Sequence, residues 1–408
     1  MKVAVVGAGA SGLVAAYAAA RNGNAVTVFE KNEKSGKKIY ITGKGRCNLT
    51  NDVPPQEFLE HVVNNPKFLR GAIYSFSPED IKKLLEDGGL RLKTERGNRV
   101  FPESDKASDV TKCLEKLCKK VGVEFIFNTK VDKIEHLDST LFDIIAQNKH
   151  YLFDKVIVCT GGLSYPLTGS TGDGYSFAEK FGHSVTDLKP ALCGLNLKGN
   201  YFAEMQGLSL RNVTLEVLCG SSVIYKELGE MLFTHFGVSG PLILTASSLI
   251  NRLDLNSVLL KVDLKPALNL KQLDDRVLKD FSASPNKDIS VVLKALLPSA
   301  MITEVLRRCS IDPKKKVNSV SRAERAALIT VIKGFEMRVA SLRDFSEAIV
   351  TSGGVNVSEI NPKTMESRLV KGLYFCGEVL DVDAFTGGFN LQIAFSTGFA
   401  AGNSIKEI

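Results

Sequence analysis

The chain contains 408 residues, of which 44% are hydrophobic and 24% charged, and its formal net charge is +7. These proportions are ordinary for a soluble globular protein and exclude low-complexity and collagen-like chains. The length predicts two or three domains. The sequence has no run of eighteen apolar residues, so we expect no membrane-spanning helix and no membrane partner.

Eight cysteines are present, without a Cys-x-x-Cys pair or any spacing typical of metal ligands. We therefore expect no metal site and interpret the cysteines as reduced, buried thiols of a cytoplasmic protein. The mild positive charge suits an anionic cofactor or substrate, but it does not by itself indicate nucleic acid.

The N-terminus combines several signals within thirty residues. Lys2–Val6 predicts a short buried strand, Leu13–Arg21 a helix, and Ala25–Phe29 a second strand that ends at Glu30. The run Gly7-Ala8-Gly9-Ala10-Ser11-Gly12 lies between the first strand and the helix. Strand, G-x-G-x-x-G turn, helix, strand and acidic residue, in this order, are typical of a dinucleotide site. A Gly/Ala-rich turn in an ordinary α/β core is the alternative interpretation.

Each glycine of this fingerprint has a separate physical role. Gly7 permits the tight turn, Gly9 lets the backbone approach a pyrophosphate, and Gly12 lets the helix pack on the strand. The helix N-terminus directs amide N–H groups and a partial positive charge at the diphosphate. Glu30 lies 18 residues after Gly12, where its carboxylate can accept the ribose hydroxyls.

The segment from 31 to 51 is too polar and glycine-rich to be core, and we interpret it as a loop that runs over the cofactor. Lys37, Lys38 and Arg46 can neutralise phosphates, and Gly43 permits close backbone approach. A solvated basic loop is the alternative.

Two later strands also end in glycine turns. The strand from 155 to 159 ends in Thr160-Gly161-Gly162, which is either a close approach to a cofactor or a simple strand end. Near the C-terminus, an apolar strand ends in Gly377-Glu378, and the turn Thr386-Gly387-Gly388 begins the last helix. The N-terminus of that helix suits the pyrimidine edge of a flavin, which gains negative charge on reduction.

The pattern changes between these two strands. Short alternating strands from residue 189 onward predict a β-rich barrel or sandwich, and four segments with i, i+3, i+4 apolar spacing predict a helical subdomain. We predict three domains: 1–188 with 345–408, 189–267 with 334–344, and 268–333. The run Lys314–Lys316 is most simply a solvated loop.

Together these stretches resemble one family, the YhiN-type or aminoacetone-oxidase-like FAD-binding flavoproteins, a branch of the two-dinucleotide-binding flavoproteins. The stretches that carry the resemblance span the whole chain: Gly7–Gly12, Thr42–Asn51, Gly161–Gly174, Gly229–Pro241, Asn361–Glu366 and Gly372–Leu391.

The resemblance implies the α/β class, with a Rossmann-like FAD-binding domain of the GR2 type built from both chain ends, an inserted β-rich domain and a helical subdomain. It also implies that Val131 contacts adenine through its backbone, and that Glu378, Asn390 and Leu391 lie at the ribityl chain and isoalloxazine. The complete expected set of FAD-binding residues is Gly7, Gly9, Ala10, Ser11, Gly12, Glu30, Lys31, Lys37, Lys38, Gly43, Arg46, Cys47, Asn48, Val131, Thr160, Gly161, Gly377, Glu378, Gly388, Asn390 and Leu391.

Members of this family are described as reductases of dienone bile-acid intermediates or as aminoacetone oxidases. We therefore expect an FAD-dependent oxidoreductase that uses NADH or NADPH to reduce a conjugated small-molecule substrate. The alternatives are an oxygen-using amine oxidase, a tRNA-modifying flavoprotein and a flavin-binding protein without turnover. The chain has no second G-x-G-x-x-G, so a nicotinamide donor would dock transiently.

The catalytic residues cannot be assigned from the sequence. Asn48, Tyr165 and His235 are candidates for substrate contact or proton transfer, although a lone histidine in an apolar strand is more often structural. The basic residues are scattered along the chain, so we expect no nucleic-acid partner. The sequence does not indicate the oligomeric state.

Overall fold

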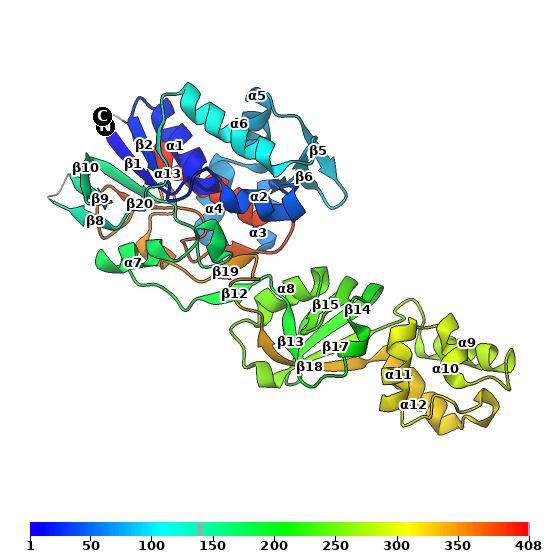
Figure 1. Ribbon diagram of the computed structural model, residues 1–408. Helices are drawn as coiled ribbons and strands as arrows, with labels where there is room; N and C mark the ends of the chain where they lie inside the picture. The colour runs from blue at the N-terminus through cyan, green and yellow to red at the C-terminus, as the bar shows by residue number, and fades with distance from the viewer. Residues whose placement is uncertain (138–140, 407–408) are drawn as a thin grey trace. The chain divides into compact units, whose positions relative to one another are not determined.

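The computed structural model describes residues 1–137 and 141–406 (Figure 1). The chain forms two compact units, Met1–Ala191 with Phe345–Ile408, and Leu192–Asp344. Within the described ranges, none of the helices combines the length and the apolar character that crossing a membrane requires.

A parallel five-stranded sheet forms the centre of the first unit. Its strand order is β20-β11-β1-β2-β7. The bounds are β1 Lys2–Val6, β2 Ala25–Phe29, β7 Glu124–Ile126, β11 Lys155–Val158 and β20 Leu373–Phe375. The strand β1 is buried along nearly its whole length, as expected for a parallel sheet that is covered on both faces. This sheet confirms the predicted Rossmann-like fold.

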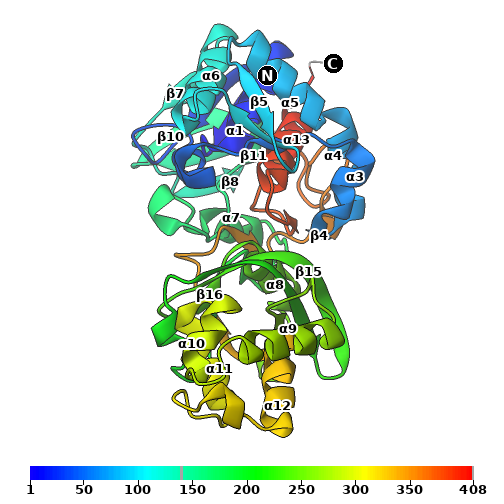
Figure 2. The same ribbon diagram turned by 90° about the vertical axis from the view of Figure 1, so that its right-hand side faces the viewer.

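Helices from the two ends of the chain pack directly on each other in this unit (Figure 2). They are α1 (Ala10–Arg21) and α13 (Phe389–Ser404). A Cβ atom added at Gly398 would lie 2.3 Å from the carbonyl oxygen of Ser11, and one at Gly402 would lie 2.2 Å from that of Ala15. The two helix backbones can approach this closely only because both positions are glycine.

The remaining elements of the first unit surround this core. Its helices are α2 Lys37–Ile41, α3 Pro55–Glu60, α4 Pro66–Ser75, α5 Pro78–Asp87, α6 Ala107–Lys120 and α7 Asp173–Lys180. Its further strands are β3 Thr50–Asn51, β4 Val62–Asn64, β5 Leu92–Glu95, β6 Arg99–Pro102, β8 Lys133–His136, β9 Phe142–Ala146, β10 Lys149–Phe153, β12 Lys189–Ala191, β19 Val350–Ser352 and β21 Asp383–Ala384.

The segment from 31 to 51 is more ordered than the predicted loop, because it contains α2 and a 3-10 turn, Thr42–Gly45. The side chain of Ile39 is only 2% exposed, and α2 packs against α6. Burial of this apolar side chain fixes a helical turn within a segment that is otherwise polar.

The second unit contains a closed barrel with the strand order β13-β16-β15-β14-β17-β18, which settles the choice between barrel and sandwich. The bounds are β13 Leu195–Leu197, β14 Ser209–Cys219, β15 Ser222–Phe233, β16 Gly237–Ser239, β17 Val258–Asp263 and β18 Phe335–Leu342. The helices are α8 Pro241–Ile250, α9 Leu270–Ser282, α10 Ile289–Val292, α11 Ser299–Arg308 and α12 Arg322–Lys333. One hydrophobic core joins barrel residues such as Leu260 to helical residues such as Leu328.

The close contact of α1 with α13 gives a testable consequence. We expect Gly402→Ala to lower the free energy of unfolding of the first unit by about 2 kcal/mol or more, because the new Cβ meets backbone atoms that cannot rotate away. Urea denaturation measures this difference. Asn403→Ala, at the exposed neighbouring position, is the control and should change stability by less than about 0.5 kcal/mol. Equal stability of the two variants would contradict the proposed packing.

Candidate functional site

In the turn Gly7–Gly12, the position of a Cβ atom would be open at Gly9 and blocked by backbone at Gly12. Gly7 follows β1 with a φ of +105°, and its N–H donates to the carbonyl oxygen of Phe29 at 2.8 Å. A Cβ at Gly12 would lie 1.9 Å from the carbonyl oxygen of Gly7, whereas a Cβ at Gly9 would meet no atom within 4 Å. The chain therefore closes the turn at Gly7 and Gly12, and Gly9 faces free space where a diphosphate can fit.

This space lies at the start of α1, for which Gly9 is the N-cap. The amide groups of a first helical turn, here those of Ala10 and Ser11, have no acceptor within the helix. The first turn contains no acidic side chain that would compete for them. A twelve-residue helix thus presents its positive end to an anion.

Glu30 is fixed beside the turn at the end of β2. Its carboxylate is buried and accepts hydrogen bonds from the backbone N–H groups of Ala8 and Asn32, each at 2.8 Å. The carbonyl oxygen of Glu30 accepts from the N–H of Thr129 at 2.9 Å, which brings the segment containing Val131 next to β2. The predicted ribose and adenine residues are therefore neighbours in space.

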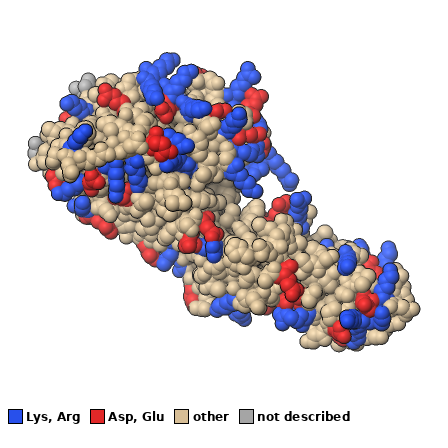
Figure 3. All heavy atoms as spheres, viewed as in Figure 1, with Lys and Arg blue, Asp and Glu red and all other residues tan. Residues whose placement is uncertain are grey.

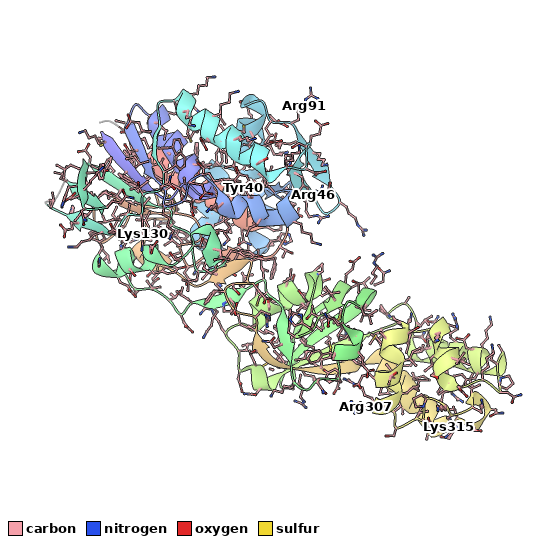
Figure 4. All side chains as sticks on the ribbon, in the orientation of Figure 1. Tyr40, Arg46, Arg91, Lys130, Arg307 and Lys315 are labelled. Atoms are coloured by element: carbon pink, nitrogen blue, oxygen red, sulfur yellow. The ribbon has the colours of Figure 1, made fainter. Side chains whose placement is uncertain are left out.

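The basic side chains of the predicted FAD-binding set are already paired with carboxylates. Lys31 pairs with Asp173 at 2.7 Å and Lys37 with Glu33 at 2.8 Å. Arg46 bridges Glu95 and Asp105 and stacks on Phe101, on the side of the hairpin β5–β6 (Figure 4). Hydrogen bonds to the two carboxylates, Glu95 first, raise the pKa of Arg46. The side chain of Arg46 is thus engaged in holding the hairpin.

Lys38 and Glu378 form a half-buried cluster that joins the two ends of the chain. The Lys38 Nζ donates to Glu378 Oε2 at 2.6 Å and to Ser164 Oγ at 2.5 Å. Glu378 Oε1 accepts from Ser164 Oγ at 2.5 Å and from the N–H of Thr351 at 3.0 Å. Sequence reasoning missed Ser164 and Thr351: Ser164 belongs to a hydroxyl-rich loop, but Thr351 carries no recognisable signal.

The C-terminal glycines bring the last strand and helix to the fingerprint. A Cβ at Gly377 would lie 2.5 Å from Ser11 Oγ, so the end of β20 contacts the start of α1. Gly388 has a φ of +101° and begins α13, where a Cβ would lie 2.4 Å from the backbone of Thr50. A second helix N-terminus is therefore formed within the same unit.

Not every predicted residue directs its side chain to open space. The Asn390 Oδ1 accepts from the N–H of Ala384 at 2.9 Å, and its Nδ2 donates to the Ala384 carbonyl at 2.8 Å, so the side chain fixes the turn before α13. Leu391, the next residue, is partly exposed. Cys47 is completely buried, and this burial raises the pKa of its thiol to about 12, which makes it unreactive.

Two buried polar atoms at the site lack partners. Asn48 Oδ1 and Thr160 Oγ1 make no hydrogen bond within the described residues. Thr160 precedes Gly161, whose φ is +73°, at the end of β11. Buried polar groups are nearly always hydrogen-bonded, so the unpaired Asn48 Oδ1 is a group that a ligand can satisfy. The Thr160 hydroxyl is instead packed against α7, where a Cβ at Gly174 would lie 2.2 Å from Thr160 Oγ1. The free space at Gly9 and the unpaired Asn48 Oδ1 fit a bound FAD.

The other two candidates for catalysis have different surroundings. Tyr165 lies in the first unit in a left-handed conformation, with a φ of +53°, and its N–H donates to the Phe345 carbonyl at 3.0 Å. Burial raises the pKa of its phenol. His235 belongs to the second unit, where it is exposed and lies edge-on to Phe236.

Known proteins resemble this chain over its full length. The family model for the HI0933-like protein Rossmann domain matches residues 1–404. The 3-dehydro-bile acid delta(4,6)-reductase of Clostridium scindens is 32% identical over 410 residues, covering 100% of this chain and 99% of the relative. The ribosomal RNA dihydrouridine synthase of Haemophilus influenzae is also 32% identical, covering 99% and 98%.

Among solved structures, the 3-ketosteroid delta1-dehydrogenase of Sterolibacterium denitrificans is similar, with a TM-score of 0.50 and 12% identity over 98% of each chain. At this identity the likeness shows a shared fold.

The fingerprint can be tested with two valine substitutions. We expect Gly9→Val to give a folded but colourless protein, because its side chain fills the diphosphate space without touching the protein. Gly12→Val should reduce folded yield, since its Cβ would overlap the backbone at Gly7. Visible absorbance and circular dichroism separate the two outcomes. A yellow Gly9→Val protein would refute the assignment.

The lysine pair at 37 and 38 offers a matched comparison. Lys38→Met leaves the half-buried Glu378 without its cation, so we expect FAD, which is an anion, to bind about tenfold more weakly. Lys37→Met leaves only the exposed Glu33 unpaired and should change FAD affinity by less than about twofold. Titration of the apo-protein with FAD, followed by fluorescence quenching, measures both. Equal effects would remove Lys38 from the site.

Proposed function

This chain, an FAD-dependent oxidoreductase, belongs to the HI0933-like family of Rossmann-domain proteins, and on that premise we propose that it reduces a carbon–carbon double bond conjugated to a carbonyl group. The observation that carries the proposal is the chemistry shared by two relatives that match the chain over its full length.

The two relatives have very different substrates but the same kind of reacting group. A 3-dehydro-bile acid with delta(4,6) unsaturation contains double bonds conjugated to its ketone. Dihydrouridine is uridine in which the ring double bond, also conjugated to a carbonyl, has been reduced. In both cases the double bond gains one hydride at the carbon remote from the carbonyl and one proton at the adjacent carbon. A site that supports reduction of the conjugated steroid therefore also suits reduction of the uracil ring.

The residues of the site support this chemistry. Bound FAD would supply the hydride, and the protein would supply binding, orientation and electrostatics. The N-terminus of α13, which begins after Gly388, offers amide N–H groups that stabilise developing negative charge. Asn48 lies two residues before Thr50, whose backbone contacts Gly388. We assign the Asn48 Nδ2 group, which can donate a hydrogen bond, to the substrate carbonyl.

The electron donor is part of the proposal. The chain contains one G-x-G-x-x-G fingerprint, which the FAD diphosphate would occupy. NADH or NADPH would therefore have no Rossmann site of its own, and would supply the hydride for the flavin by docking transiently. The amine-oxidase alternative would instead use oxygen to accept the electrons.

A uracil base within ribosomal RNA is the second candidate substrate. The specific observation in its favour is the full-length match to the Haemophilus influenzae relative, at the same identity as the match to the bile-acid reductase. Both substrates belong to the proposed reaction class, so the choice between them concerns what holds the substrate.

Half-reactions separate these possibilities. Under anaerobic conditions we expect NADH or NADPH to bleach the flavin, and a conjugated dienone steroid or an unmodified ribosomal RNA transcript to restore its colour, because each accepts the hydride. Stopped-flow absorbance measures both steps, with a saturated steroid and a fully reduced dihydrouridine transcript as controls. Failure of both nicotinamides to bleach the flavin, with turnover of aminoacetone in air, would replace this proposal by an amine oxidase.

A further inference from the structure

The net positive charge is concentrated in the helical segment of the second unit, residues 268–333. This segment contains thirteen Lys or Arg and seven Asp or Glu, a net charge of +6, whereas the whole chain has a net charge of +7. The other 342 residues contain 39 basic and 38 acidic side chains and are nearly neutral. Almost all of the chain's net positive charge therefore lies in this one segment.

Backbone hydrogen bonds gather several of these cations on one surface. The N–H of Ile289 donates to the carbonyl of Lys315 at 2.9 Å, and the N–H of Val317 donates to that of Lys287 at 3.1 Å. The side chains of Ile289 and Val317 are buried and anchor the two loops that make this contact. Two loops that are nearly thirty residues apart in the sequence are thus fixed to each other.

Helix α12 adds a further cation. Lys315, labelled in Figure 4, belongs to one of these loops. It pairs at 2.7 Å with Glu324, which also closes the capping box of Ser321 at the start of α12. The hydrogen bond from Lys315 is the main cause that lowers the pKa of Glu324 to about 2. Arg322, the first residue of α12, therefore lies next to the two loops. We call Lys287, Lys314, Lys315, Lys316 and Arg322 the basic loop surface.

Three of these five cations are free to bind an external anion. Lys315 and Lys316 are paired with Glu324 and Asp288. Within the described residues, no ion pair involves Lys287, Lys314 or Arg322, and all three are exposed. Figure 3 shows Lys and Arg side chains projecting from the helical segment. The positive end of α12 adds to the same field.

The segment lacks the groups that would stack on unpaired bases. Its one aromatic residue is Phe281, which is 8% exposed and part of the core. Single-stranded RNA is usually held by exposed aromatic rings, whereas a base-paired backbone is held by cations on its phosphates. A rigid cationic surface without aromatics therefore fits the phosphates of a folded RNA.

We propose that the basic loop surface docks folded, base-paired RNA through its phosphates and thereby holds the RNA whose uracil base is to be reduced. The proposal rests on the ribosomal RNA substrate suggested under the proposed function. It requires no sequence-specific contact by the helical segment, because phosphate contacts set position while contacts to the base specify the target.

The test compares three holo-proteins for binding to a fluorescein-labelled ribosomal RNA hairpin, by anisotropy at about 50 to 200 mM KCl. One variant combines K287Q, K314Q and R322Q. We expect its affinity to fall about tenfold or more, and the slope of log affinity against log salt to decrease by about two to three. The control combines K112Q, K116Q and K120Q on α6, which removes the same charge from exposed positions and should bind within about twofold of the parent.

Several outcomes would overturn the proposal: no binding by the parent, equal weakening in both variants, or tighter binding to poly(U) than to the hairpin. Binding only to phosphatidylglycerol vesicles would indicate that the surface binds an anionic membrane and would also overturn the proposal.

Reduction of a dienone steroid by the same proteins is measured in parallel. If the steroid is reduced normally but RNA does not bind, the docking proposal is wrong and the proposed function stands. If RNA binds but no conjugated substrate is reduced, the proposed function is wrong and the binding surface stands. Melting temperature and bound FAD confirm that each variant is folded.

Discussion

The contact between α1 and α13 is the interaction on which the rest of the first unit, Met1–Ala191 with Phe345–Ile408, depends. Glycines at 398 and 402 let the helix backbones touch, and the same approach brings Gly377 against Ser11. Without this contact, the fingerprint would remain an isolated diphosphate cradle. With it, the N-terminal turn, the Lys38–Glu378 cluster and the start of α13 form one site from segments more than 300 residues apart.

This site is built from backbone dipoles more than from free cations. Lys31, Lys37 and Arg46 are neutralised by carboxylates, and Lys38 is shared between Glu378 and Ser164. The charge that faces an anionic cofactor therefore comes mainly from helix N-termini, which are fixed in direction and lose no side-chain entropy on binding.

The sequence allows prediction of the features that depend on local pattern. Lys2–Val6, the glycine fingerprint and Glu30 could be placed because strand, turn and helix signals follow one another within thirty residues. The partners of Arg46 and Lys38 could not, because they lie 59 and 340 positions away and nothing local marks them. The helix α2 could not be predicted for a similar reason. Its residue Ile39 is buried in a unit where α2 packs against α6, whereas the residues around Ile39 in the sequence are polar and indicate a loop.

The clustering of charged side chains from different elements also could not be predicted from local sequence. Lys314–Lys316 looks like a solvated loop in the sequence, because two of its neighbours on the surface, Lys287 and Arg322, come from other elements. Only the folded chain shows that carboxylates pair with Lys31, Lys37, Lys38 and Arg46 of the predicted FAD site, while Lys287, Lys314 and Arg322 of the helical segment have no ion-pair partner within the described residues. If the substrate is a base within RNA, as proposed, the two parts of the chain would have separate tasks, since the flavin site would hold the base while the cationic surface of the helical segment binds the phosphates.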